Sequence, residues 1–200
     1  MIAAFILANH NPPYVPAMVE SCKKVLGCKV VQFSDLKTPG TAGVDEVVRL
    51  PFVSPFMCFR FEHIIAFPHD ELLLLDSDVI VKKDVHHVFD QPFDVALTKR
   101  FVRQNVPLHM PYNSGVMFSR GPAFWVDCLE YCKTLDDYGQ RWYGDQVSIA
   151  AVAEAGKHKV LELTCAQYNW SPETRDEVSD AHIWHFKGST RKPWIPSVSL

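Results

Sequence analysis

Residues 71–81 read ELLLLDSDVIV, a run of four leucines followed at once by two aspartates one residue apart. A continuous apolar run of this length predicts a strand in the core of the protein. Asp76 and Asp78 follow where this strand ends, and carboxylates beside a core are costly unless they are paired or solvated. The segment therefore predicts both a central strand and a site that needs a partner.

Short β-rich runs alternate with helical patterns along the chain, as is typical of a mostly parallel sheet flanked by helices. Strands are expected at 2–8, 29–35, 71–75, 93–99, 115–120, 159–164 and 181–186. Helices are expected at 14–27, 54–67, 122–135 and 145–155, with Gly27 ending the first and Ser54 capping the second. With 200 residues and no visible linker, the chain is predicted to form a single compact α/β domain, 1–200.

The overall composition excludes several classes of protein. Lys and Arg number 20 against 23 Asp and Glu, for a net charge of -3, so no global basic field is available to gather nucleic acid. No apolar run approaches the roughly 18 residues of a membrane span. The six cysteines form no C-x-x-C pair, and no export signal is recognised. We therefore expect reduced thiols and a cytoplasmic location.

Polar residues gather where the predicted strands end. The first strand leads into Asn9, His10 and Asn11, the second ends at Asp35, and the leucine strand leads into its two aspartates. In open α/β sheets, ligands bind beyond the carboxyl ends of the strands. We therefore expect the ligand site at this edge of the sheet.

The Asp-x-Asp pair is suited to holding a cation. In an extended segment Asp76 and Asp78 point the same way and Ser77 the opposite way. Two carboxylates that face one spot repel each other unless a cation lies between them, and Mg²⁺ and Mn²⁺ both accept carboxylate oxygens. The structural alternative is that both aspartates simply end the strand and cap a turn.

An apolar strand followed by Asp-x-Asp-Val also resembles the first motif of haloacid-dehalogenase-type phosphatases, in which Asp76 would be a nucleophile. That motif normally lies near the start of its domain, whereas here two strands and two helices precede it. Of the later motifs, only the paired aspartates of LDDYG, 135–139, offer a match, and they follow a helix pattern. The phosphatase remains the enzymatic alternative.

Five motifs occur in one order along nearly the whole chain: ANHNPPY, FRFEHIIAFPHDELLLLDSDVIVKKDV, YNSGVMFSRG, WYGDQVSIAAVA and HFKGSTRKPW. Together they resemble GT-A glycosyltransferases of family 8, which includes the glycogenin and bacterial lipooligosaccharide galactosyltransferase types. The resemblance implies a Rossmann-like GT-A fold. It also implies transfer of a hexose from a nucleotide sugar, UDP-glucose or UDP-galactose, with retention of anomeric configuration.

The resemblance also assigns roles to individual residues. It implies that Mn²⁺ or Mg²⁺ is bound by Asp76, Asp78 and His185. Donor-binding residues are expected at Ala8, Asn9, Asn11, Arg60, Asp76, Ser77, Gly188 and Lys192. The sugar pocket and reaction centre are expected at Asn113, Ser114, Asp145 and Gln146, with Gln146 near the anomeric carbon. The family usually has two residues between the glycine and lysine of its last motif, whereas this chain has three, so either Arg191 or Lys192 is expected at the diphosphate.

Each assignment has a structural alternative. His185 can be a satisfied imidazole near the core, Arg60 an exposed helix charge, and Asp145 a helix N-cap. The residues from Asn9 to Asn11 can form an Asx-type turn before Pro12. At the level of the whole protein, a relative that binds a nucleotide or sugar without turnover is the non-enzymatic alternative.

The acceptor is left open by the sequence, because acceptor contacts come from variable loops. A glycan, a lipid-linked sugar, a protein and a modified nucleic acid all fit. The loop 99–112 is basic and carries apolar residues, and loops of this length often shape binding sites. If it contributes, we expect Arg100 or Arg103 to meet a negatively charged acceptor.

Overall fold

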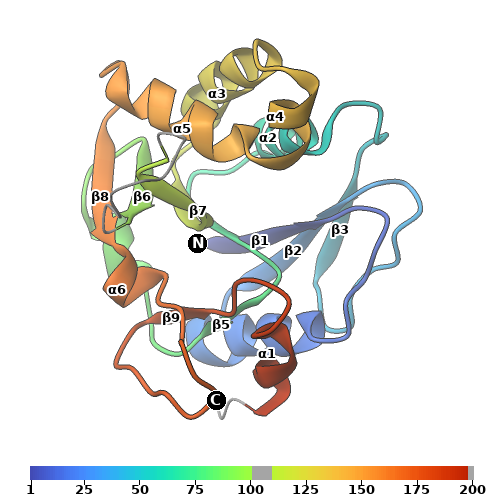
Figure 1. Cartoon of the computed structure of the whole chain (residues 1–200), viewed down its shortest axis with the longest axis vertical. Helices are drawn as coiled ribbons and strands as arrows, with labels where there is room; N and C mark the ends of the chain where they lie inside the picture. Colours follow the sequence, from blue (N-terminus) through green and yellow to red (C-terminus); the bar gives the residue numbers. More distant parts are fainter. Residues whose placement is uncertain (101–109, 198–200) are drawn as a thin grey trace.

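The computed structural model describes residues 1–100 and 110–197, and its main feature is a seven-stranded sheet (Figure 1). The strand order is β3-β2-β1-β4-β7-β6-β8. All neighbouring pairs are parallel except those of β7, which runs antiparallel to both β4 and β6, so the sheet is mostly parallel as predicted. The strands are β1 Ile2–Leu7, β2 Lys29–Ser34, β3 Glu46–Arg49, β4 Leu72–Leu75, β6 Val95–Lys99, β7 Tyr112–Ser119 and β8 Val160–Thr164.

Helices cover both faces of the sheet. One face packs on α1 Val15–Leu26, and the other on α2 Phe56–Ala66, α3 Ala123–Lys133 and α5 Gly144–Glu154 (Figure 1). The leucine strand contributes to both cores, because Leu73 and Leu75 join the first and Leu72 and Leu74 the second. Since strand side chains alternate between faces, a central strand of this sheet must be apolar throughout.

A small second sheet brings the C-terminal part of the chain to the end of β4. It pairs β5 Val79–Val81 with β9 Ile183–His185 in antiparallel orientation, with Val79 opposite His185. A separate cluster that includes Ile80, Trp184 and Phe186 packs there. This pairing sets a residue near the C-terminus beside the Asp-x-Asp segment.

The structure corrects several local predictions. Ser54 does not cap α2, because the N-cap residue is Pro55 and the Ser54 hydroxyl donates a hydrogen bond to Glu62 at 2.7 Å. Gly27 does end α1, in the left-handed conformation at φ 61°. Asp76 to Asp78 form a turn instead of continuing the strand, and that turn carries the chain from the large sheet into β5. Elements missed by the sequence analysis are β3, β5, α4 Asp137–Trp142, α6 Cys165–Tyr168, and the short helices η1 His86–Asp90 and η2 Lys192–Ser197.

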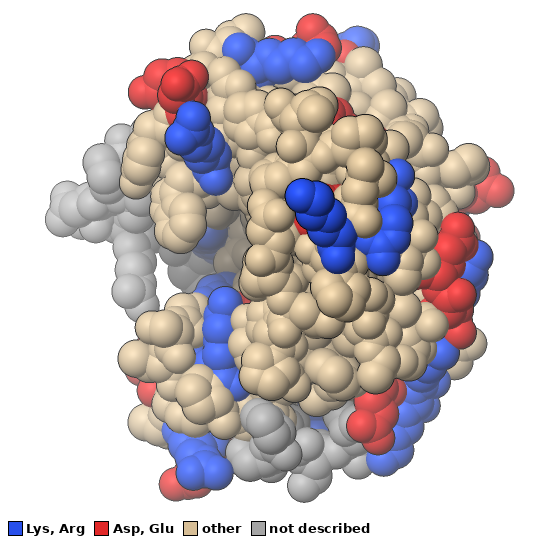
Figure 2. Space-filling view, turned by 90° about the vertical axis from the view of Figure 1, so that its right-hand side faces the viewer, with Lys and Arg blue, Asp and Glu red and all other residues tan. Residues whose placement is uncertain are grey.

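The surface carries both signs of charge. Figure 2 shows basic and acidic side chains interspersed over one face of the molecule. All six cysteines lie in the described part of the chain and are unpaired. Among the described helices, none has the length and apolar character needed to span a lipid bilayer.

Candidate active site

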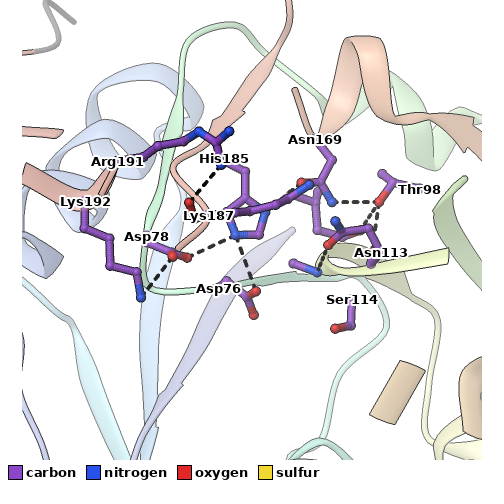
Figure 3. Close-up of polar contacts among 12 residues, drawn as sticks. Asp76, Asp78, Thr98, Asn113, Ser114, Asn169, His185, Lys187, Arg191 and Lys192 are labelled. Atoms are coloured by element: carbon purple, nitrogen blue, oxygen red, sulfur yellow. Dashed lines mark hydrogen bonds and ion pairs between the residues drawn. The ribbon is translucent and has the colours of Figure 1, made fainter. Parts of the chain in front are cut away.

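Three side chains that could hold a metal ion converge between the two sheets (Figure 3). One ligand atom from each of Asp76, Asp78 and His185 lies within 4.8 Å of the others. The His185 Nε2 is 3.1 Å from Asp78 Oδ1 and 3.6 Å from Asp76 Oδ2. We call these three residues the metal group. Their meeting is the long-range contact that the sequence analysis predicted.

His185 is held in a defined orientation by a buried chain of hydrogen bonds. Its Nδ1–H donates to Asn169 Oδ1 at 2.7 Å, and Asn169 Nδ2 donates to Thr98 Oγ1 at 2.8 Å. The Thr98 hydroxyl donates in turn to the Asn113 carbonyl at 3.0 Å. With Nδ1 occupied, Nε2 is the atom that faces the two carboxylates, as in protein sites where an outer partner orients a metal-binding histidine.

These outer partners were missed by the sequence analysis. Asn169 is 1% exposed and Thr98 is fully buried, and buried polar residues need partners. A buried asparagine is expected to have a hydrogen-bond partner. No sequence pattern, however, connects Asn169 with a histidine 16 residues later. The connection exists only because β6 and the segment before β9 lie side by side in the fold.

The backbone of Gly115 lies directly against the metal group, which is possible because glycine has no side chain. Its carbonyl accepts a hydrogen bond from Asp76 N at 2.8 Å. A Cβ built at this position would lie 2.2 Å from His185 Cε1 and 2.9 Å from Asp76 Oδ2, distances that real atoms do not adopt. The glycine in the YNSGVMF motif is therefore required by the close approach of β7 to the histidine ring.

Arg60 joins the metal group to the start of α5. Its Nη2 lies 3.2 Å from Asp76 Oδ1 and donates to the Ser114 carbonyl at 2.7 Å, while Nη1 lies 3.0 Å from Asp145 Oδ2. Arg60 is 8% exposed, so the alternative of an exposed helix charge is wrong. Asp145 is not an N-cap either, because it lies in the first turn of α5, where its Oδ1 accepts from Gln146 N at 2.8 Å.

Lys192 and Arg191 point to different partners. The Lys192 ammonium lies 3.2 Å from Asp78 Oδ2, whereas Arg191 Nη1 donates to the Lys187 carbonyl at 3.2 Å. Of the two cations, Lys192 is thus the one directed at the metal group (Figure 3). Gly188, between them and β9, has φ +80°, a conformation that favours glycine. Their contact with a diphosphate stays a prediction.

The charges around Asp78 favour its ionised form. Burial by itself would raise the pKa of Asp78, but the hydrogen bond and charge of His185, together with Lys192, outweigh burial and lower the pKa below its usual value. For Lys192, burial would lower the pKa, but Asp78 and Tyr14 outweigh it and raise the pKa. The carboxylate that faces the histidine is therefore available as a ligand at neutral pH.

The predicted nucleotide-binding loop is fixed by a hydrogen bond to the carboxylate of Asp35. Asn9 has a left-handed backbone at φ 60°, and its N–H is 2.8 Å from both Asp35 Oδ2 and Thr38 Oγ1. Burial opposes ionisation of Asp35, but hydrogen bonds from Thr38, Asn9 and Lys37 outweigh it and hold its pKa well below the usual range. The turn therefore rests on Asp35 instead of on an Asx bond of its own. Asn9 and Asn11 are exposed, and Ala8 is buried beneath them.

The predicted sugar pocket is lined by residues of β7 and α5. Asn113 and Ser114 are each 5% exposed, and Asn113 Oδ1 accepts from Gly115 N at 2.9 Å. Gln146 Oε1 accepts a hydrogen bond from Arg100 Nη2. The roles of Asn113, Asp145 and Gln146 in the reaction, and that of Ser77 at the donor, stay predictions. Arg103 lies outside the described residues.

Comparison with known proteins supplies the class of fold. No protein-family model matches the sequence, and no match was found among curated proteins. Among solved structures, that of the galactosyltransferase LgtC in complex with donor and acceptor sugar analogs has a TM-score of 0.69 at 11% identity, covering 100% of this chain and 97% of that chain. The glycosyltransferase GlyE of Streptococcus pneumoniae TIGR4 has a TM-score of 0.65 at 13% identity, covering 95% of this chain and 55% of that chain.

The chain therefore has the GT-A fold of these glycosyltransferases, as the motifs predicted. At such low identity the likeness concerns the arrangement of the backbone.

Proposed function

We propose that the protein is a glycosyltransferase of the family 8 type that depends on Mn²⁺ or Mg²⁺. Its donor is UDP-glucose or UDP-galactose, and the hexose passes to an acceptor with retention of configuration. The observation that carries the proposal is the convergence of Asp76, Asp78 and His185 within 4.8 Å at the end of β4 in a GT-A fold.

The three side chains of the metal group fit a divalent ion. Two carboxylates and one imidazole suit Mn²⁺, and carboxylates also suit Mg²⁺. Because Asn169 accepts the Nδ1 hydrogen, the lone pair of neutral His185 lies on Nε2, 3.1 Å from Asp78 Oδ1. When bound, such an ion would neutralise charge on the departing diphosphate as the bond between sugar and phosphate oxygen breaks.

Protein side chains would contribute to the same step. Lys192, 3.2 Å from Asp78, would place a fixed positive charge beside the diphosphate. Arg60 holds Asp76 and Asp145 in place with two ion pairs, which keeps one metal ligand and the start of α5 in a fixed relation. Preorganisation of this kind removes the cost of rearranging the site during the reaction.

The contacts of Asp145 support a front-face route to retention. A double displacement needs a carboxylate free to attack the anomeric carbon. One oxygen of Asp145 is paired with Arg60 and the other accepts the Gln146 N–H, so each oxygen already has a partner that holds it in place. Gln146 is an amide, which is a poor nucleophile. The acceptor would then attack from the side that the leaving diphosphate occupies.

A donor screen tests the proposal. Release of UDP from UDP-glucose, UDP-galactose and other UDP-sugars would be measured with and without Mn²⁺, with calorimetry of UDP binding alongside. We expect release that depends on the metal, and its loss in Asp78→Ala with the fold intact by circular dichroism. Asp84→Ala, which removes an exposed carboxylate outside the site, is the matched control. Unaltered turnover in Asp78→Ala would contradict the mechanism.

The same preparation separates the alternatives. Manganese-dependent UDP binding without release or transfer would support a catalytically silent relative. A phosphoaspartate trapped at Asp76 would support the phosphatase, which no observation in the described structure favours. The aspartates of LDDYG lie at the start of α4, where the Asp136 side chain caps the helix by accepting from Gly139 N at 2.7 Å.

A further inference from the structure

The cations around the site fall into two groups. Arg60 and Lys192 each have a carboxylate oxygen within 3.2 Å. Arg100 and Lys187 have no carboxylate within the 4.0 Å of an ion pair among the described residues. The sequence of 101–109, FVRQNVPLH, contains no Asp or Glu that could serve either of them. We call Arg100 and Lys187 the cation pair.

Both members of the cation pair are half-buried beside the predicted sugar pocket. Arg100 follows β6 directly and reaches Gln146 Oε1 with Nη2. Lys187 follows β9, two residues after His185. Cys165 interacts electrostatically with both Arg100 and Lys187, which places the two side chains around it. Burial is the main cause that lowers the pKa of Arg100, and it outweighs the opposing charges of Cys165 and Asp145.

The cation pair is directed away from the diphosphate end of the site. In Figure 3, Lys192 reaches Asp78 from one side of the metal group, whereas the Lys187 side chain extends toward the side where Asn113 and Asn169 lie. A partly buried cation with no anionic partner is costly, and the cost is recovered when an anion binds there.

The balance of charges in the site indicates which substrate carries the anionic group. In the proposed function, on which this inference rests, the divalent ion and the diphosphate carry opposite charges of equal size. Arg60 and Lys192 carry two positive charges against the three negative charges of Asp76, Asp78 and Asp145. One negative charge is thus left over for the two positive charges of the cation pair, and one positive charge stays uncompensated. A neutral hexose would bring no charge to the cation pair. We propose that Arg100 and Lys187 bind an anionic group of the acceptor, a carboxylate or a phosphate, so that the protein glycosylates acidic acceptors.

A binding experiment on the full chain tests this. The protein would be loaded with Mn²⁺ and UDP, and calorimetry would compare glucose 6-phosphate with glucose and galacturonate with galactose. We expect each acidic sugar to bind at least about tenfold more tightly than its neutral counterpart, and the difference to shrink as salt is raised. Equal binding of the acidic and neutral sugars would overturn the proposal.

Variants identify the residues responsible. Lys187→Met should reduce the preference for acidic sugars about tenfold, and Lys187→Arg should restore most of it because the charge is kept. Lys133→Met, which removes an exposed lysine on α3, should leave the preference unchanged. An unchanged preference in Lys187→Met overturns the assignment of Lys187. Weaker binding of UDP itself in that variant would place Lys187 at the diphosphate and overturn it as well.

Two further outcomes separate the sources of the anion and the two proposals. If Lys187→Met selectively weakens UDP-glucuronate relative to UDP-glucose, the anionic group belongs to the donor sugar, and the acceptor proposal is wrong. If the protein binds acidic sugars through Lys187 but shows no manganese-dependent UDP binding, the anion site stands and the proposed glycosyltransferase function fails.

Discussion

The metal group and the cation pair lie in one site but are built in opposite ways. Around Asp76, Asp78 and His185, every charged side chain has an opposite charge nearby, and a hydrogen-bonded chain fixes the histidine ring. Around Arg100 and Lys187, no carboxylate of the described chain is close enough for an ion pair. The first arrangement offers three ligand atoms to a cation, and the second offers two cationic groups to an anion.

This difference suggests how the fold divides its tasks. Paired, buried groups resist rearrangement, because removing one partner strands the other in a medium of low dielectric. Unpaired groups leave their interaction energy for a ligand. We therefore expect mutations in the metal group to disturb both folding and metal binding, and mutations in the cation pair to disturb ligand choice alone.

The largest effect is expected for Gly115→Ala, which breaks the metal group by steric overlap. The new Cβ would lie 2.2 Å from His185 Cε1, so the imidazole or β7 must move. Manganese affinity by calorimetry should fall by more than the roughly 100-fold that loss of an outer partner costs. Gly121→Ala is the control, since its Cβ meets nothing within 4 Å although φ is +78°. That variant should lose some stability but keep its manganese affinity.

Arg60→Met tests whether pairing makes the metal group structural. Its removal leaves Asp145, which is 3% exposed, without its cation, so we expect the free energy of unfolding to fall by about 3–5 kcal/mol in urea denaturation. Lys187→Met is the matched comparison, with an expected change below about 1 kcal/mol. Similar losses in the two variants would remove the distinction between paired and unpaired cations.

Asn169→Ala sharpens the comparison within the metal group. Loss of the acceptor for His185 Nδ1–H should weaken manganese binding about 10–100-fold, because the ring and its tautomer are no longer fixed. Asn169→Asp keeps an acceptor at the same place and should retain most of the affinity. Wild-type affinity in Asn169→Ala would mean that β9 alone positions the histidine.

The smallest effect is expected for the pH dependence of the free energy of unfolding. It arises from a histidine outside both the metal group and the cation pair. His63 is fully buried in α2, its Nε2–H donates to the Ser34 carbonyl at 3.0 Å, and its Nδ1 has no partner among the described residues. Burial lowers the pKa of His63 to about 4. The unfolded chain therefore binds this proton at a higher pH than the folded chain, and stability should fall as the pH drops from about 6.5 toward about 4.

The size of this pH effect follows from linkage. Between pH 7 and about pH 5.5 the loss of unfolding free energy should be about 1 kcal/mol. His63→Gln, which cannot be protonated, should flatten this part of the stability profile relative to wild type. Parallel profiles for the two proteins would show that His63 does not titrate as its burial implies. Manganese titrations at acid pH need this correction before any loss is ascribed to the metal group.

The parallel half of the sheet could be predicted well from the sequence. β1, β2 and β4 were located within one or two residues, because each is a short apolar run bounded by turn residues and separated by helical patterns. β3 was missed, since only four residues of mixed polarity form this edge strand and none of them is buried. α4 was missed because its six residues carry a glycine and too few apolar positions to show a helical period.

The site residues likewise divide into those that could be predicted from the sequence and those that could not. Asp76, Asp78 and His185 were predicted together from motif resemblance, and Arg60 was singled out with them. The predicted reason for the aspartates facing one way was wrong, since they lie in a turn and not along an extended strand. Asn169, Thr98 and Lys187 were not predicted as site residues, because each matters through partners that other segments of the chain supply.

The sequence by itself determined that a mostly parallel sheet would present carboxylates at the end of a buried strand, because periodicity and strand ends are local properties of the chain. Only the tertiary structure decided which cations those carboxylates neutralise and which they leave unpaired. Charge compensation depends on distances of a few ångströms between segments far apart along the chain. Those distances are fixed by the pairing of β5 with β9 and by the course of the chain beyond β6.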